Sequence, residues 1–339
     1  MRFVVTGGCG FIGSNMIHYL LDRYPDAEVL NIDALTYAGN RENVATLENN
    51  PRYHFLQLDI TDRPALREAL EQFRPDGIVH LAAETHVDNS ISGPAAFVMT
   101  NFVGTYNLLE EARLLWDGET SGRFLHVSTD EVYGSIEGDG AFDEESPYRP
   151  NSPYSATKAG SDHLVRAWYV TYGMNVVTTN CSNNFGPRQH REKLIPTVIA
   201  TALAGKQIPV YGDGKNVRDW LYVGDHCAAI DKVFREGRSG ETYAIGARNE
   251  WTNIDLVRLI CTILDEEVGG GPDGSYASLI SFVTDRPGHD RRYAVDPGKI
   301  ESELGWTRGR PFQETLRETV VWYAEQFRDA AEQNSTEKL

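Results

Sequence analysis

The sequence is poor in cysteine and in basic residues, and both shortages narrow the range of functions. Its 339 residues include four cysteines, with no Cys-x-x-Cys pair and no His/Cys spacing typical of a metal site. Isolated cysteines predict a reducing compartment, the cytoplasm, and no bound metal. Lys and Arg number 32 against 49 Asp and Glu, a net charge of −17. This acidity argues against nucleic acid or an anionic membrane as a partner.

Long apolar runs are also missing. No 18 consecutive residues are apolar, and Met1 is followed directly by a strand-like segment rather than by a basic stretch and an apolar leader. We therefore expect a protein that neither spans a membrane nor carries a targeting signal. The chain is longer than one hydrophobic core usually supports, so one large domain or two closely joined domains are expected.

The first 181 residues alternate short apolar runs with longer amphipathic segments. Continuous apolar strands separated by segments of helical period are typical of a parallel sheet covered by helices on both faces. The apolar runs occupy residues 2–7, 28–33, 53–60, 77–83, 123–130 and 175–181, and the helical patterns occupy residues 11–24, 61–73, 97–115 and 152–172. The pattern predicts an α/β fold with a doubly wound parallel sheet, the Rossmann arrangement.

The composition changes after Cys181. Loops rich in Asn, Arg, His and Tyr, with two late helices near residues 254–266 and 312–329, predict a smaller mixed α/β substrate-binding lobe at the C-terminal side. We expect residues 1–181 with about 217–247 to form the Rossmann domain, and about 182–216 with 248–330 to form the lobe. Residues 331–339 are expected to be a flexible tail.

A glycine-rich turn follows the first strand. Gly7, Gly10 and Gly13 have the spacing G-x-x-G-x-x-G and open the first helix. Glycines there permit a tight turn and close approach of the backbone to a pyrophosphate, which the helix N-terminus attracts. A glycine turn without a ligand is the alternative. Asp33 closes the second strand, where a carboxylate accepts hydrogen bonds from the adenosine ribose and repels a 2′-phosphate, so NAD is favoured over NADP.

Further NAD contacts are expected from residues of the same turn, from the ends of neighbouring strands and from the helix at 97–115. They are Phe11, Ile12, Asp59, Ile60, Leu81, Ala82, Ala83 and Thr100, together with Tyr154 and Lys158 from the helix at 152–172.

Tyr154 and Lys158 lie four residues apart in "SPYSATK", so on a helix they share one face. A phenol titrates near 10, but a nearby ammonium stabilises the phenolate. We expect Lys158 to bring the Tyr154 pKa down so that the phenolate takes a proton from a hydroxyl while NAD takes the hydride. Thr129, at the end of the preceding strand, is expected to bind the same hydroxyl. Such Tyr/Lys pairs also occur on ordinary helix surfaces.

Several motifs in order resemble one family. They are the glycine turn, Asp33, "HLAAETHVDNSI", "VSTDEVYG", "SPYSATKAGSD", "NNFGP", "EKLIP", "NVRDWLYV" and "DRPGHDRRY". From residue 1 to about 325 the chain resembles the extended short-chain dehydrogenases that act on nucleotide sugars, most closely the dTDP-glucose 4,6-dehydratase family. The resemblance implies tightly bound NAD recycled in each turnover, dTDP-glucose or a related nucleotide sugar as substrate, and a homodimer through a bundle of helices near Val103–Leu115 and Ser161–Tyr172.

Two adjacent acids, Asp130 and Glu131, follow Thr129. After C4 of the sugar is oxidised, loss of water needs a base for the C5 proton and an acid for the departing C6 hydroxyl. By resemblance, Glu131 is that base and Asp130 that acid. Neighbouring residues of a regular strand point to opposite faces, so the assignment requires the strand to end near Thr129. A solvated strand end is the alternative.

Substrate contacts are expected mainly in the smaller lobe, where basic and donor groups suit a diphosphate. With the resemblance, they are Thr85, Thr129, Asn183, Lys193, Leu194, Pro209, Tyr211, Arg218, Asn253, Arg286, His289 and Tyr293.

Two other functions stay open from the sequence. A nucleotide-sugar 4-epimerase or decarboxylase would share the NAD site, Tyr154 and Lys158, but has no need of the Asp130 and Glu131 pair. A catalytically silent NAD-binding regulator would keep the fold, although its usual mark, a broken set of catalytic residues, is missing here. The sequence leaves thymidine and uridine nucleotides undistinguished.

Overall fold

A computed structural model describes residues 1–117, 122–136, 138–285 and 290–336. In this part of the chain, seven strands form one parallel sheet in the order β10-β6-β5-β4-β1-β2-β3. The order reverses at β1, which pairs with β2 on one side and β4 on the other. This is the predicted doubly wound arrangement, so the fold prediction is confirmed. The strands are β1 (Arg2–Thr6), β2 (Glu28–Asp33), β3 (Tyr53–Gln57), β4 (Gly77–His80), β5 (Arg123–Thr129), β6 (Val176–Cys181) and β10 (Thr242–Ile245).

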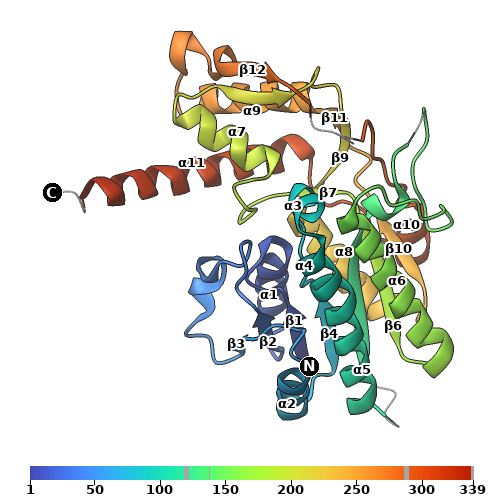
Figure 1. The fold of residues 1–339 in the computed structure, drawn as a ribbon. Helices are drawn as coiled ribbons and strands as arrows, with labels where there is room; N and C mark the ends of the chain where they lie inside the picture. Colours follow the sequence, from blue (N-terminus) through green and yellow to red (C-terminus); the bar gives the residue numbers. More distant parts are fainter. Residues whose placement is uncertain (118–121, 137, 286–289, 337–339) are drawn as a thin grey trace.

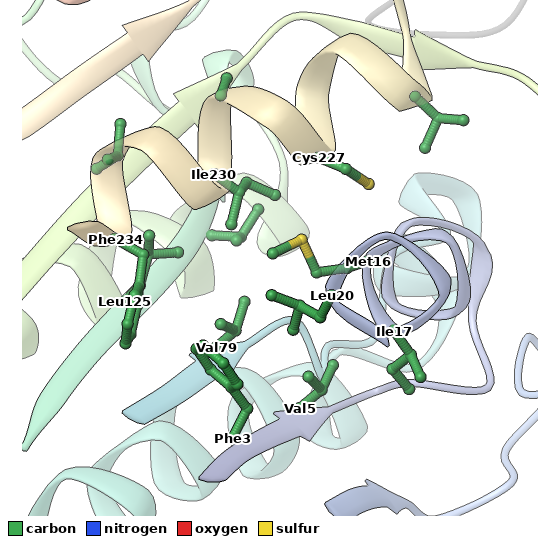
Figure 2. Close-up of a cluster of buried hydrophobic side chains, with 14 of the residues drawn as sticks. Phe3, Val5, Met16, Ile17, Leu20, Val79, Leu125, Cys227, Ile230 and Phe234 are labelled. Carbon is green, nitrogen blue, oxygen red and sulfur yellow. The ribbon is translucent and has the colours of Figure 1, made fainter. Parts of the chain in front are cut away.

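Helices cover both faces of the sheet, because alternate residues of each strand point to opposite faces. On one face, Phe3 and Val5 pack with Met16 and Leu20 of α1 and with Phe234 of α8 (Figure 2). On the other face, the intervening strand residues pack against helices α2, α5 and α6. These helices are α1 (Phe11–Arg23), α2 (Arg63–Phe73), α5 (Thr105–Leu115), α6 (Pro153–Tyr172) and α8 (Val223–Glu236).

The predicted helix at 97–115 is interrupted. It consists of α4 (Pro94–Phe97), a π-helical segment η2 (Val98–Gly104) and then α5. Within η2, the buried Asn101 accepts a hydrogen bond from the Glu84 backbone N–H (2.8 Å) and donates to Thr157 (3.0 Å). Stretches of π-helix are frequent at functional sites. Here the segment ties the loop after β4 to α6. The short helix α3 (Val87–Ser92) precedes α4.

A second group of elements lies at one end of the parallel sheet (Figure 1). Its strands form two small sheets, β11-β9-β7 and β12-β8, and helices α7, α9 and α11 enclose a separate apolar core with them. The strands are β7 (Asn183–Phe185), β8 (Ile208–Tyr211), β9 (Val217–Tyr222), β11 (Glu250–Thr252) and β12 (Ile280–Val283). The helices are α7 (Leu194–Leu203), α9 (Asn253–Glu267) and α11 (Phe312–Thr336). Helix α10 (Gly298–Leu304) instead packs through Ile300 and Leu304 into the core of the large sheet, beside β10 (Figure 1). Short 3-10 helices are η1 (Arg41–Leu47), η3 (Asp130–Tyr133), η4 (Pro272–Gly274) and η5 (Tyr276–Leu279).

Two details differ from the sequence pattern. Strand β9 pairs with β7 and β11 rather than with the large sheet, although α8, which follows it, packs against α1. Helix α11 extends to Thr336, beyond residue 331 where the sequence predicts a flexible tail, because residues 330–333 (Ala-Ala-Glu-Gln) are good helix formers. No helix in the described ranges is both long and apolar enough to cross a lipid bilayer.

Candidate active site

A cavity of about 310 Å³ lies where strands β1, β2, β4 and β5 end. This is the carboxyl edge of the sheet at its switch point, where doubly wound folds bind their ligands. All the expected catalytic and cofactor-binding residues line this cavity. They are Gly7, Gly10, Phe11, Ile12, Gly13, Asp33, Asp59, Ile60, Leu81, Ala82, Ala83, Thr100, Thr129, Asp130, Glu131, Tyr154 and Lys158. Four expected substrate residues, Thr85, Thr129, Asn183 and Lys193, line it as well.

The glycine turn is shaped for close packing. Gly7 has a φ of +71°, and a Cβ atom on Gly13 would lie 2.1 Å from the Gly7 carbonyl oxygen, so only glycine fits there. Helix α1 begins at Phe11, and in the described chain no side chain caps its first turn. Its free N–H groups and the positive end of the helix dipole therefore face the cavity, as a pyrophosphate requires.

Asp33 closes β2 in a buried position at the edge of the cavity. Its carboxylate accepts hydrogen bonds from the backbone N–H groups of Cys9 (2.9 Å) and Leu35 (2.8 Å). Burial raises the pKa of Asp33, and these two hydrogen bonds oppose that rise. The two bonds fix the carboxylate at the position where a nucleotide ribose is bound in this fold. The turn and Asp33 together fit NAD.

The chain leaves the strand conformation where the two acids begin. Strand β5 ends at Thr129, and η3 starts at Asp130, with Thr129 Oγ1 accepting a hydrogen bond from the Glu131 N–H (3.3 Å). The 3-10 turn brings both carboxylates to the same cavity. The expected strand end near Thr129 is confirmed, so the side-chain alternation of a regular strand no longer separates the two acids.

Asp130 is a buried carboxyl group, 3% exposed. Burial, helped by the nearby charge of Glu131, raises its pKa from an ordinary 3.8 to about 8. The Thr129 hydroxyl donates a hydrogen bond to Asp130 Oδ1 (3.2 Å), and Oδ2 has no hydrogen-bond partner among the described residues. Asp130 is thus protonated at neutral pH, the state that a general acid needs.

Tyr154 and Lys158 lie in the first turns of α6, which starts at a capping box formed by Ser152 and Ser155. Both side chains are buried. Burial and the charge of Glu131 raise the Tyr154 pKa well above its usual value, and a hydrogen bond with Thr129 opposes this rise. The net lowering of the Tyr154 pKa that we expect from the sequence is not found in this structure. Burial outweighs any such effect, and Lys158 Nζ instead donates to the Val127 carbonyl (2.8 Å).

Four of the remaining expected substrate residues lie in the second group of elements, outside the lining of this cavity. Leu194 begins α7, Pro209 and Tyr211 belong to β8, and Asn253 begins α9. Arg286 and His289 fall outside the described residues.

Arg218 and Tyr293 lie close to the acids. The Arg218 guanidinium stacks over the Tyr293 ring at 4.5 Å and donates to the Asp290 carbonyl (2.9 Å). Its positive charge lowers the Asp130 pKa, whereas the negative charge of Glu131 adds to burial in raising the Tyr293 pKa. The two residues thus adjoin the cavity from the side of β9 and the segment after β12.

One group of residues at the edge of the cavity was not predicted from the sequence. Glu192 Oε2 lies 3.5 Å from His86 Nε2 and 3.4 Å from His190 Nδ1, and the rings of both histidines contact Tyr37. These residues come from loops after β2, β4 and β7, all at the same sheet edge. Their position after strands was readable from the sequence, but their contacts were not. Among the described residues, no group of three or more His, Cys, Asp or Glu is arranged to hold a metal ion.

Comparisons with known proteins agree with this geometry. The model of the GDP-mannose 4,6 dehydratase family matches residues 4–319. A probable dTDP-glucose 4,6-dehydratase of Sinorhizobium fredii is 54% identical over 331 residues, which cover 96% of this chain and 93% of that protein. The structure of a dTDP-glucose 4,6-dehydratase from Streptomyces venezuelae with NAD bound superposes with a TM-score of 0.87 at 48% identity, covering 96% of this chain and 97% of the other.

The same fold is shared with enzymes of different chemistry. The UDP-glucose 4-epimerase of Thermotoga maritima superposes with a TM-score of 0.85 at 28% identity, covering 96% of this chain and 99% of the other. Fold similarity alone does not separate the two reactions, but the sequence identity is higher with the dehydratase than with the epimerase. The chain belongs to the GDP-mannose 4,6 dehydratase family, in which its near relatives are dTDP-glucose 4,6-dehydratases.

Proposed function

We propose that this protein uses NAD to dehydrate dTDP-glucose to the 4-keto-6-deoxy sugar nucleotide. The observation that carries the proposal is the pair Asp130 and Glu131, both in one cavity with Tyr154 and Lys158. A 4-epimerase of the same fold only oxidises and reduces C4. Its reaction therefore does not require two additional acidic residues. Relatives named dTDP-glucose 4,6-dehydratase over nearly the whole chain support the choice of substrate.

In the proposed mechanism, the first turn of α1 holds the pyrophosphate of NAD, and Asp33 holds its adenosine ribose. NAD held there would supply the hydride chemistry, by which C4 of the sugar is oxidised and C6 is later reduced. Tyr154 takes the proton of the 4-hydroxyl, which Thr129 also binds, and Lys158 provides a positive charge that favours this transfer.

Elimination of water is the task of the two acids. Glu131 removes the C5 proton, which the new C4 ketone makes acidic, and Asp130 gives its proton to the departing C6 hydroxyl. The raised pKa of Asp130, about 8, keeps this proton in place at neutral pH. Glu131 then returns its proton to C5 as the hydride reaches C6. The proton taken from the 4-hydroxyl balances the one that leaves with water.

Substrate binding is proposed for Thr85, Asn183 and Lys193 at the cavity, with Arg218 and Tyr293 beside them. The positive charge of Arg218 and Lys193 suits a diphosphate. Leu194, Pro209, Tyr211 and Asn253, together with Arg286 and His289, are proposed to hold the rest of the nucleotide.

The experiment is incubation of the purified, NAD-containing protein with dTDP-glucose, UDP-glucose and GDP-mannose in parallel. The alkaline absorbance of a 4-keto sugar and the NMR signal of a C6 methyl group identify the product. We expect product from dTDP-glucose at the highest rate. Recovery of the C4 epimer instead, or of unchanged sugar from folded protein, would overturn the proposal. Glu131→Gln is expected to form NADH without releasing product.

Residues 1–181 with about 217–247 are proposed to bind NAD, and residues 182–216 with 248–330 to bind the nucleotide sugar. The support is that β10 belongs to the parallel sheet and α8 to the core around α1, whereas α7, α9 and α11 have their own core. The four described cysteines are free and buried, which fits the cytoplasm as the proposed location.

A homodimer through α5, α6 and the adjoining η2 is proposed as well. Apolar side chains are exposed on these segments, namely Met99 (49%) and Phe102 (38%) on η2 and Val170 (62%) on α6. Such a patch typically marks a protein interface. Light scattering tests the proposal, because Met99→Glu with Val170→Glu should give a monomer. The control Phe282→Glu, on the exposed strand β12, should leave the dimer intact.

A further inference from the structure

A buried carboxylate beneath the active site has no role in the mechanism above. Asp162 lies on α6, four residues after Lys158, so the two residues share a helix face. Its side chain is 4% exposed. A carboxylate so far from water is retained only with hydrogen-bond donors and a compensating positive charge. Asp162 has both kinds of neighbour: hydrogen-bond donors and a nearby positive charge.

The first connection is to the strand that carries the catalytic residues. Asp162 Oδ2 accepts hydrogen bonds from the Ser128 hydroxyl (2.8 Å), the Tyr148 hydroxyl (2.9 Å) and the Asn180 amide (3.3 Å). The same Asn180 amide donates to the Thr129 carbonyl (3.1 Å). Asp162 and Asn180 therefore hold the last two residues of β5 where the chain turns to the two acids.

The second connection is electrostatic. Lys158 is buried, and burial lowers its pKa to about 8, while the negative charge of Asp162 is the main opposing influence. The other described titratable groups near the ammonium include Tyr154 on the same face of α6, Cys181 on β6, His80 on β4 and His126 on β5. Both imidazoles have lowered pKa values and are neutral at pH 7, and the Cys181 thiol, with a pKa of about 12, is neutral as well.

Among the described groups that face Lys158, Asp162 is thus the carboxylate that compensates its charge. The other oxygen of Asp162, Oδ1, lies 3.1 Å from His126 Nε2, which is uncharged. Without Asp162, the ammonium would be buried among neutral groups, and its proton would dissociate more readily.

We propose that Asp162 is a positioning residue of this active site: one helical turn from Lys158 on α6, it supplies the buried negative charge beside that ammonium and fixes the end of β5 from which Thr129, Asp130 and Glu131 extend. The catalytic part of this inference rests on the proposed function. Asp162 itself lies outside the lining of the cavity, so it acts through Lys158 and the strand.

The test compares Asp162→Asn with Tyr148→Phe and Asp162→Glu. Tyr148→Phe removes one hydrogen bond to Asp162 but leaves the charge, and Asp162→Glu keeps a carboxylate. The readout is the pH dependence of single-turnover NADH formation with dTDP-glucose. We expect Asp162→Asn to move the alkaline limit of this step down by about one pH unit or more, because Lys158 loses its proton earlier. Tyr148→Phe should leave the limit unchanged, and Asp162→Glu should restore it at least in part.

A second readout does not depend on catalysis. NMR titration of protein labelled at the lysine Cε atoms, assigned with Lys158→Met, reports the protonation of Lys158 directly. We expect Lys158 to stay charged at pH 7 in the unsubstituted protein and to titrate lower in Asp162→Asn. A Lys158 that is neutral at pH 7 in the unsubstituted protein overturns the inference. So does an Asp162→Asn protein that is slower by the same factor at every pH with an unchanged Lys158 titration. If dTDP-glucose is not dehydrated at all, the proposed function fails, while the NMR titration still decides the role of Asp162.

Discussion

Replacing Asp130 by Asn tests the division of labour between the two acids. The substitution keeps the shape and burial of the side chain but removes its dissociable proton. The protein raises the pKa of Asp130 from 3.8 to about 8, which corresponds to about 6 kcal/mol against the ionised form. At pH 7 about ten protonated Asp130 groups exist for each ionised one, and at pH 9 the ratio is reversed.

Two results are expected from this. In Asp130→Asn, dehydration should slow by about 10²- to 10⁴-fold, the usual contribution of a general acid, while NADH formation at C4 changes little. In the unsubstituted protein, the rate of water loss should fall about tenfold per pH unit above pH 8 as Asp130 ionises. Stopped-flow absorbance of NADH separates oxidation from elimination, and the alkaline absorbance of the 4-keto product measures the whole reaction. Dehydration at the normal rate by Asp130→Asn would refute the acid role.

Stability gives an independent measure of the same pKa. Because the folded-state pKa of Asp130 lies above its unfolded value, the carboxyl favours the folded state most below about pH 4. That contribution is lost as the pH rises toward about 8. The Asn side chain cannot ionise, so Asp130→Asn does not lose stability as the pH rises. At pH 7 to 8 its free energy of unfolding should exceed that of the unsubstituted protein by several kcal/mol, and its melting temperature should be higher. Near pH 4 the two proteins should be equally stable. Equal melting curves at pH 8 would contradict the raised pKa.

Three further predictions concern the NAD side of the cavity. Gly13→Ala places a Cβ atom 2.1 Å from the Gly7 carbonyl oxygen, so it should destabilise the protein by about 1–3 kcal/mol and lower its NAD content. The control Gly93→Ala, whose Cβ atom would lie 3.7 Å from its nearest neighbour, should change neither property. Denaturant unfolding measures the stability, and the NAD released on heating measures the NAD content. Tyr154→Phe should lower kcat by about 10²- to 10⁴-fold with NAD content unchanged, and a smaller loss would assign the proton transfer to another group. Asp33→Ser should reduce co-purified NAD and raise binding of NADP relative to NAD, as measured by calorimetry; an unchanged ratio would mean that Asp33 does not contact the ribose.

Much of the large sheet could be predicted from the sequence because its strands are buried on both faces. The apolar runs at residues 2–7, 28–33 and 123–130 correspond to strands β1, β2 and β5. The cavity lies where these strands end, next to the switch point of the sheet. Local periodicity is sufficient for such strands. It is not sufficient for β9, whose partners β7 and β11 were decided by packing in the smaller core.

The chemistry at the site was predictable from the sequence where it depended on residue type and spacing. It was not predictable where it depended on how deeply a side chain is buried. The strand end at Thr129 followed from the need to bring two neighbouring acids to one cavity. The pKa of Tyr154 did not follow from the sequence, because it depends on how completely neighbouring side chains exclude water. One such neighbour is Phe97, whose ring centroid lies 6.4 Å from that of Tyr154. Asp162 was missed for a related reason. Its hydrogen-bond partner Ser128 lies 34 positions away in the chain, a separation that no local pattern reveals.

The turn at the end of β5 places a hydroxyl and two carboxylates on three consecutive residues. The relative positions of these groups are therefore fixed by peptide bonds rather than by the docking of distant segments. Natural variation in α7, α9 and β8, which have their own apolar core, can alter which nucleotide or sugar is held without moving the reacting groups against one another. A protein engineer who wishes to change the substrate should accordingly graft loops of the smaller core and leave residues 123–134 intact.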